Sequence, residues 1–144
     1  MDPRALIERS LESTLSDASR DVCPPGLAAA VRHAVFPGGA RVRPLLCLGV
    51  AAACGGPGPA ALASAASIEL LHCASLVHDD LPCFDDADIR RGKPSVHRQF
   101  GEPVAVLAGD ALIILAFEAL ADACKDAPAM LPRLVSILAR AVGM

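Results

Sequence analysis

Apolar residues recur at helical spacing along most of the chain. Four of them mark one face of residues 3–20: Leu6, Ile7, Leu11 and Leu15. This spacing predicts an amphipathic helix, which Cys23, the two prolines after it and Gly26 are expected to stop. Further helices are expected over residues 27–36, 43–53, 60–78 and 102–123, and after Pro128.

Polar positions are concentrated in one internal segment, residues 79–101, which is rich in turn residues. It directly follows residues 60–78, where apolar side chains leave few polar positions, so that helix is expected to be buried. Glycine and proline at residues 37–39 and 55–59 indicate turns between helices. The pattern predicts an all-α fold, a single domain over residues 1–144 with one long charged loop.

Composition agrees with this fold and excludes several functions. The chain of 144 residues is 53% hydrophobic and 20% charged, as expected for one globular domain with its own core. Aromatic residues make up only 3%, which favours close-packed helices over a β-sandwich. The net charge of −3 gives no reason to expect nucleic acid. Asp110 and Glu118 interrupt the apolar stretch 104–121, which is interpreted as a buried helix and not a membrane span.

The six cysteines show neither CxxC spacing nor a histidine pair at zinc-finger spacing. Five of them lie in apolar or alanine-rich surroundings, where a free cysteine behaves as a small hydrophobic residue. This usage indicates a reduced, cytoplasmic location. The sequence after Met1 has no apolar segment typical of a signal peptide.

Five aspartates occur at the start of the charged loop: Asp79, Asp80, Asp85, Asp86 and Asp88. Carboxylates crowded at the end of an apolar helix repel one another and require a compensating cation. Oxygen ligands without histidine or cysteine at matching spacing favour Mg²⁺ over zinc. Mg²⁺ commonly bridges carboxylates to substrate phosphates, and four candidate phosphate donors follow the aspartates: Arg90, Arg91, Lys93 and Arg98.

The same charge pattern also fits a solvated network of surface ion pairs, each of which would contribute little stability. Two features favour the metal–phosphate interpretation: the loop follows directly on an apolar helix, and Pro82 and Pro94 stiffen its backbone. A second anion-binding point is expected at Gly38-Gly39, where the backbone can approach a ligand closely, with Arg41 and Arg43 after it at a helix start. Together the two segments predict a site for two phosphorylated ligands.

Three segments resemble the trans-isoprenyl diphosphate synthases, also called polyprenyl synthetases. Residues 71–94 resemble the first aspartate-rich motif of this family with its trailing Arg-Arg-Gly. Residues 38–44 resemble its GGKxxRP element, and residues 107–112 match its LAGDAL segment. The segments occur in the order of the family, and the resemblance extends over residues 30–125.

The resemblance implies an isoprenoid synthase-type helical bundle around a central cavity. In this family an allylic diphosphate held by Mg²⁺ ionises and is attacked by isopentenyl diphosphate, so the resemblance implies a prenyltransferase of isoprenoid biosynthesis. By position, Asp79 and Asp85 would be the catalytic metal ligands, with Asp80 a further candidate, and Arg90 would contact the allylic diphosphate. Three residues would bind isopentenyl diphosphate: Arg43, His72 and Arg91. The family further implies a homodimer that serves terpenoid or carotenoid synthesis.

The step of six residues from Asp79 to Asp85 does not keep both side chains on one helix face, so the chain is expected to leave the helix near Asp80. This longer spacing resembles the bacterial and plant short-chain enzymes. Before Asp79, the small residues Ala74 and Ser75 stand where farnesyl-forming relatives tend to have an aromatic residue. The resemblance therefore implies geranylgeranyl diphosphate as the preferred product and farnesyl diphosphate as the next.

Two departures from the family pattern bear on function. Ala40 replaces the usual lysine of GGKxxRP, which removes one isopentenyl diphosphate contact unless the neighbouring Arg41 substitutes. After Asp88 no second aspartate-rich motif follows. The chain is therefore expected to correspond to the N-terminal half of a synthase, with exposed apolar surface on helices such as 60–78.

Alternatives to an active prenyltransferase remain. The chain could be a non-catalytic partner or regulatory subunit of a synthase, or an inactive fragment of one, because prenyl transfer by the 144-residue chain alone is not expected without a second aspartate-rich motif. A helical metal-binding bundle unrelated to isoprenoids is a further class. That class needs carboxylates and histidines three residues apart on facing helices, and the sequence has no such pattern.

Overall fold

The computed structural model describes residues 2–19, 23–36, 38–56 and 58–143. The helices in these ranges are α1 (Pro3–Ala18), α2 (Pro25–Val35), α3 (Val42–Ala53), α4 (Pro59–Asp79), α5 (Val96–Phe100), α6 (Glu102–Ala123) and α7 (Leu131–Val142). A hairpin of β1 (Ile89–Arg90) and β2 (Lys93–Pro94) precedes α5, and a short 3-10 helix, η1 (Pro128–Met130), precedes α7. The predicted all-α fold is confirmed, and the long helices begin and end close to their expected positions.

Two details differ from the expected elements. Pro25 and Gly26, expected to stop a helix, form the first turn of α2, because the first turn of a helix leaves its amide hydrogens unpaired and proline has none to lose. The charged loop after α4 contains the hairpin and α5, which its polar composition did not indicate. Pro37 and Pro57, expected in turns, and Arg20, expected in the first helix, lie outside the described residues.

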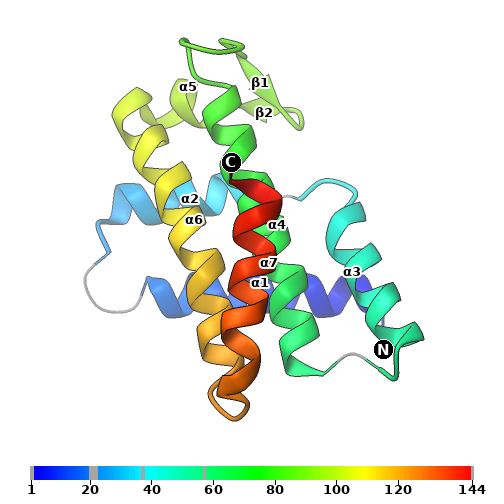
Figure 1. Ribbon diagram of the computed structural model, residues 1–144. Helices are drawn as coiled ribbons and strands as arrows, with labels where there is room; N and C mark the ends of the chain where they lie inside the picture. The colour runs from blue at the N-terminus through cyan, green and yellow to red at the C-terminus, as the bar shows by residue number, and fades with distance from the viewer. Residues whose placement is uncertain (1, 20–22, 37, 57, 144) are drawn as a thin grey trace.

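Helix α4 is the centre of the fold (Figure 1). It runs antiparallel to α6, and these two helices share the most extensive contact between any pair of described elements. Small residues permit this contact: Ala105, Ala108 and Ala116 of α6 are fully buried, and Ser67 Oγ donates a hydrogen bond to the Ala116 carbonyl at 2.7 Å. Close backbone approach between α4 and α6 thus fixes the direction in which α4 reaches the charged loop.

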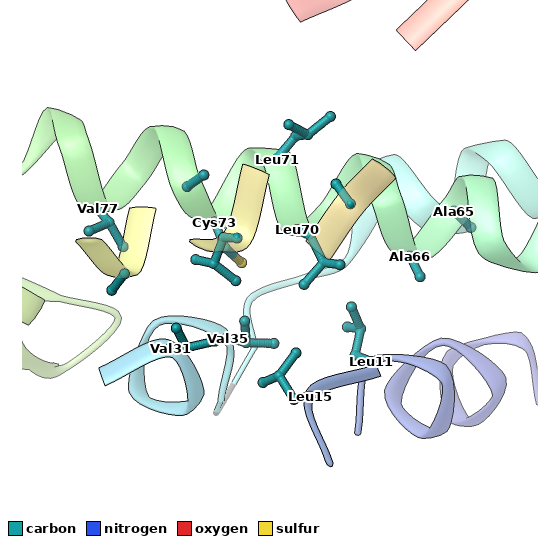
Figure 2. Packing of buried hydrophobic residues seen from close by; sticks show 14 of the residues in the cluster. Leu11, Leu15, Val31, Val35, Ala65, Ala66, Leu70, Leu71, Cys73 and Val77 are labelled. Carbon is teal, nitrogen blue, oxygen red and sulfur yellow. The ribbon is translucent and has the colours of Figure 1, made fainter. Parts of the chain in front are cut away.

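Another face of α4 packs on α1 and α2. Figure 2 shows this layer, in which apolar side chains of the three helices meet: Leu11 and Leu15, Val31 and Val35, and Leu70, Cys73 and Val77. All of them are buried, and burial of each such side chain stabilises the fold by about 1.5–3 kcal/mol relative to exposure. Helices α1 and α2 therefore pack against one face of α4, and the site lies on another face.

Large apolar side chains remain exposed on α3, α6 and α7. By length and composition α4 and α6 are each apolar enough to cross a membrane, but 56% of the apolar window of α4 is buried against 33% for α6. The expectation of a buried helix over residues 104–121 is therefore right for one face of α6 alone, since Leu107 and Ile114 are exposed. Exposed apolar surface was expected on residues 60–78, but it lies mainly on α6 and on a stripe of α3 formed by Val42, Leu46 and Val50.

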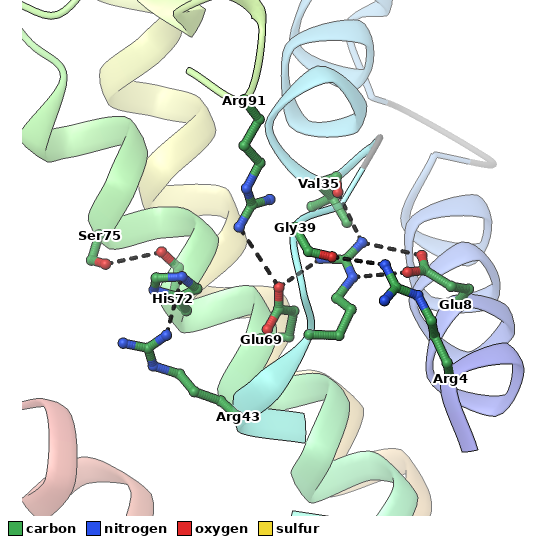
Figure 3. A network of polar contacts seen from close by, with 10 residues as sticks. Arg4, Glu8, Val35, Gly39, Arg43, Glu69, His72, Ser75 and Arg91 are labelled. Atoms are coloured by element: carbon green, nitrogen blue, oxygen red, sulfur yellow. Dashed lines mark hydrogen bonds and ion pairs between the residues drawn. The ribbon is translucent and has the colours of Figure 1, made fainter. Parts of the chain in front are cut away.

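A buried arginine connects the N-terminal helices to α4. Arg41, only 2% exposed, donates through Nε and Nη2 to the Glu8 carboxylate at 2.9 and 3.1 Å, and through Nη1 to Glu69 Oε1 at 2.6 Å. Its Nη2 also donates to the Val35 carbonyl at 3.0 Å. Burial would lower the pKa of Arg41, but the hydrogen bonds that it donates to Glu8 and Glu69 raise it above its ordinary value. Figure 3 shows how Glu8 and Glu69 approach this network from α1 and α4.

We expect the Arg41→Leu variant to lose about 3 kcal/mol of unfolding free energy, because the buried Glu69 would keep only Arg91, 3.9 Å away, as a partner among the described residues. Urea denaturation followed by circular dichroism measures the loss. Arg32→Leu is the matched control: it removes the Arg32–Glu12 ion pair, whose side chains are 56% and 45% exposed, and it should cost less than about 1 kcal/mol. Equal losses in the two variants would contradict the special position of Arg41.

Candidate functional site

The candidate site begins where α4 ends. The helix stops at Asp79, and the loop after it folds back so that the Asp85 amide donates to the Asp79 carbonyl at 2.9 Å and the Ala87 amide to the Asp80 carbonyl at 3.2 Å. The chain thus leaves the helix at Asp80, as the six-residue spacing predicts. Through this return the backbones of Asp79 and Asp85 lie side by side, and both residues are exposed.

Three of the five aspartates are held by arginines. Asp80 is 2% exposed and accepts hydrogen bonds from the Arg90 guanidinium, which raise the pKa of Arg90. Arg98 donates to Asp86 at 3.0 Å and to Asp88 at 2.7 Å. Within the described part of the chain, Asp79 and Asp85 take part in no such ion pair. The loop therefore leaves two carboxylates accessible to a cation.

The hairpin after the aspartates aims Arg91 into the site. Arg91 and Gly92 have φ of 53° and 77° and form the two-residue turn between β1 and β2, where positive φ matches the twist of the strands. The Arg91 guanidinium lies against Gly39, where a Cβ atom would be 3.1 Å from Nε, and its Nη2 is 3.9 Å from Glu69 Oε1. Its Nη1 is buried and has no hydrogen-bond partner among the described residues.

A basic hollow of about 360 Å³ lies beside this arginine, and Arg43, His72, Arg91 and Glu69 contribute to its wall. The Arg43 Nη1 and His72 Nε2 atoms are 3.3 Å apart (Figure 3). Burial, and then the positive charge of Arg43, lower the pKa of His72. The structure thus brings together the three residues expected to bind one diphosphate.

Arg41 is the exception among the expected anion-binding residues. Its guanidinium is 0% exposed and is held in ion pairs with Glu8 and Glu69, so it cannot replace the lysine missing at Ala40. A Cβ atom at Gly38 would lie 2.1 Å from Arg41 Cζ, so this glycine makes room for the buried guanidinium. The expectation that Arg41 forms an anion-binding point is wrong, because neutralising Glu69 requires it inside the fold.

A longer groove of about 820 Å³ continues from the hollow along α4. Arg43 and His72 border both, while Ala74, Ser75 and Phe117 line the groove from α4 and α6, and α7 lies along it. Ala74 is buried to 2% exposure, whereas Ser75 is exposed, so a larger side chain at Ser75 would enter the groove without disturbing the core. The wall is mostly apolar, which suits a hydrocarbon chain.

The exposed aspartates fit Mg²⁺ in the number of carboxylates that they offer. Among the described residues, no cluster of three or more metal-ligating side chains is preassembled. Mg²⁺ does not need one, because it retains several waters and binds through one or two carboxylates and the phosphate oxygens of a substrate. Asp79 and Asp85 supply two exposed carboxylates of that kind.

Two residues of this region escape pattern-based prediction. Glu8 is one of several charges on an amphipathic helix, and His97 lies in a polar loop, so neither stands out. Glu69 offered a signal, because it is the one acidic residue among apolar neighbours between residues 60 and 78 and a buried charge requires a partner.

The glycine of the LAGDAL segment, Gly109, is explained by the packing of α6 on α4. A Cβ atom at this position would lie 2.1 Å from His78 Nε2, so a larger residue would clash with the ring.

An all-α bundle whose central helix ends at the exposed Asp79, with Asp85 beside it and a basic hollow nearby, is of the isoprenoid synthase class. Residues 24–143 match the polyprenyl synthetase family, and the chain belongs to this family. It is 53% identical over 139 residues to the geranylgeranyl diphosphate synthase of Cereibacter sphaeroides, covering 96% of this chain and 48% of the relative. The corresponding synthase of Rhodobacter capsulatus is 54% identical over 138 residues, covering 95% of this chain and 48% of the relative.

Solved structures show the same fold. The geranyltransferase from Legionella pneumophila superposes with a TM-score of 0.90 at 35% identity, over 98% of this chain and 50% of that one. The geranylgeranyl pyrophosphate synthetase from the archaeon Geoglobus acetivorans superposes with a TM-score of 0.84 at 40% identity, over 96% and 43%. The chain spans about half the length of the curated relatives it matches.

We expect Arg43→Ala to raise the pKa of His72 toward its ordinary value of about 6.5, because the substitution removes a nearby positive charge that disfavours the protonated ring. An NMR titration of the His72 ring resonances measures the shift. Arg32→Ala, which removes an arginine on the far side of α2 from the hollow, should leave the His72 titration unchanged. An unmoved pKa in Arg43→Ala would mean that burial alone depresses it.

Proposed function

We propose that the chain carries the substrate sites of a short-chain isoprenyl diphosphate synthase. In this reaction isopentenyl diphosphate condenses with an allylic diphosphate to give a longer prenyl diphosphate. The observation that carries the proposal is the basic hollow of Arg43, His72 and Arg91, which joins the apolar groove and lies beside the aspartates that end α4. A diphosphate with a hydrocarbon tail matches this adjacency of charge and apolar wall.

Each residue has a part in the proposal. Asp79 and Asp85 would hold Mg²⁺, which when bound neutralises the charge of the allylic diphosphate as it departs. Arg90, fixed by Asp80, presents the outer edge of its guanidinium to the same diphosphate. Asp80 was the further metal candidate, and its bonds to Arg90 favour a positioning part instead.

The isopentenyl diphosphate would occupy the hollow. Arg43 and Arg91 donate to its phosphate oxygens, and neutral His72 can donate one further hydrogen bond. The double bond of this substrate would then face the groove, where the allylic carbon is presented. Ala74 and Ser75 leave the groove open, which favours geranylgeranyl diphosphate as product over farnesyl diphosphate.

The remaining parts of the proposal rest on family resemblance. They are a cytoplasmic homodimer, a part in terpenoid or carotenoid synthesis, and the presence of this chain as the N-terminal half of the working site. The second candidate function is a non-catalytic partner subunit of such a synthase. A partner subunit does not need to bind a diphosphate in the hollow. Measuring diphosphate binding therefore distinguishes the synthase function from the partner-subunit function.

We expect isopentenyl diphosphate to bind the chain in isothermal titration calorimetry and Arg91→Ala to weaken it by about tenfold to a hundredfold, because one charge-assisted hydrogen-bonding group is lost. Arg43→Ala should act in the same direction. Lys125→Ala removes an equal charge from an exposed pair with Asp122 and should leave affinity unchanged. Absence of binding by the unsubstituted chain, or equal binding by all variants, would support the partner subunit.

We expect Ser75→Phe to lower the affinity for geranylgeranyl diphosphate by about tenfold and to leave that for dimethylallyl diphosphate unchanged, because the ring would occupy the far part of the groove. Calorimetric titration with both ligands in Mg²⁺ measures the difference. Ser136→Phe, at an exposed serine of α7 outside the groove lining, is the matched control. Parallel losses for the short and the long ligand would contradict a chain-length function for this position.

A further inference from the structure

His97 has a buried nitrogen atom without a hydrogen-bond partner. Its side chain is 2% exposed, and its Nδ1 lies 3.0 Å from the Oγ of Ser95, itself 1% exposed. No described residue hydrogen-bonds to Nε2. The nearest charged atom is Asp86 Oδ1, at 3.7 Å. A buried imidazole nitrogen without a partner is costly unless the position serves a purpose.

Asp86 is itself held in an uncommon backbone conformation. Its φ is 47°, in the left-handed region, and its amide donates to the Leu81 carbonyl at 3.1 Å. Such a conformation is unfavourable for a residue other than glycine and persists only where the surroundings enforce it. Asp86 directly follows Asp85, so holding Asp86 in place restrains the backbone on the C-terminal side of Asp85.

Two side chains of α5 face this carboxylate. Arg98 donates to Asp86 Oδ1 at 3.0 Å, and His97 Nε2 points at the same oxygen from the buried side. Ser95 orients the ring: if its hydroxyl donates to Nδ1, the proton resides on Nε2, the atom that faces Asp86. Helix α5 thus contacts the aspartate loop through the exposed Arg98 and the buried His97.

We propose that His97 is a positioning residue for the aspartate loop, which it holds through Asp86 so that Asp85 lies beside Asp79. The contact that carries this role is the 3.7 Å approach of His97 Nε2 to Asp86 Oδ1. The role rests on the proposed function for its purpose, since an ordered Asp85 matters when a cation binds. The ordering of the loop by His97 does not itself require a cation, so it can be measured in the metal-free chain.

The two amide analogues of histidine separate the contacts of the ring. In His97→Gln the side-chain amide nitrogen reaches the position of Nε2 and can still donate to Asp86. In His97→Asn the shorter side chain reaches the position of Nδ1, so it keeps the contact to Ser95 and loses the one to Asp86. Both replacement side chains are polar and no larger than histidine, so each fits the space that the imidazole occupies.

Hydrogen–deuterium exchange of the metal-free 144-residue chain tests the proposal. We expect His97→Asn to speed exchange in residues 82–88 by about tenfold, because it removes the buried ring that faces the Asp86 carboxylate at 3.7 Å and so makes local opening of the loop easier. These residues include the amides of Asp85, Asp86 and Ala87, which donate to carbonyls at the end of α4. His97→Gln should stay within about threefold of the unsubstituted chain, and α6 should be unaffected in both.

Asp86→Ala keeps the test valid even if the histidine variants are poorly folded, because Asp86 is exposed and its replacement leaves the core intact. It should itself speed exchange in residues 82–88. Combined with each histidine variant, it should abolish the difference between asparagine and glutamine. Equal exchange in the two histidine variants, or acceleration spread evenly over α6, would overturn the positioning role.

Calorimetric titration of the same proteins with Mg²⁺ and inorganic pyrophosphate separates this proposal from the proposed function. Lack of binding by the unsubstituted chain would count against the function and leave the exchange result to decide on His97. Binding that weakens by about tenfold in His97→Asn but not in His97→Gln would support both, because residues behind metal ligands typically change metal affinity by that factor or more.

Discussion

The fold depends on one buried positive charge. Arg41 connects Glu8 of α1, Glu69 of α4 and the last carbonyl of α2, so three elements far apart in sequence meet at a single guanidinium. Removing Arg41 or Glu69 would leave the other charge buried without its partner. The ion pair therefore constrains the fold strongly, even though its net contribution to stability is small. Glu69 belongs to both the core and the site, since Arg91 approaches the same oxygen.

This shared carboxylate explains how a rigid core positions a site made largely of loop residues. Helix α4 carries Glu69, His72, Ser75 and Asp79 at successive turns, so one side of a single helix connects the ion-pair network, the basic hollow, the groove and the aspartates. The hairpin adds Arg91 from above, and its left-handed turn residue directs the side chain inward. The site is therefore as well ordered as α4, which α1, α2 and α6 hold on several sides.

Much of this arrangement could be predicted from the sequence. Helical periodicity gave the long helices, and the spacing of Asp79 and Asp85 required the chain to leave the helix at Asp80. The function of Arg41 could not be predicted, because its neighbour Arg43 has the same charge and the choice between core and hollow depends on Glu8 and Glu69, distant in sequence. The division of the aspartates was equally hidden: Asp80 is buried against Arg90, and no local pattern distinguishes it from the exposed Asp79 beside it.

The pairing of Arg90 and Arg98 with Asp80, Asp86 and Asp88 leaves two neighbouring surfaces of opposite sign. The loop retains uncompensated negative charge at Asp79 and Asp85, and the hollow retains positive charge at Arg43 and Arg91. Two ligands with the same diphosphate head group would be sorted by their counterions and not by their shape. Under the proposed function, a magnesium complex would bind at the loop aspartates and the bare anion would bind in the hollow. Low magnesium would therefore blur the distinction between the two positions, with both ligands competing for the hollow.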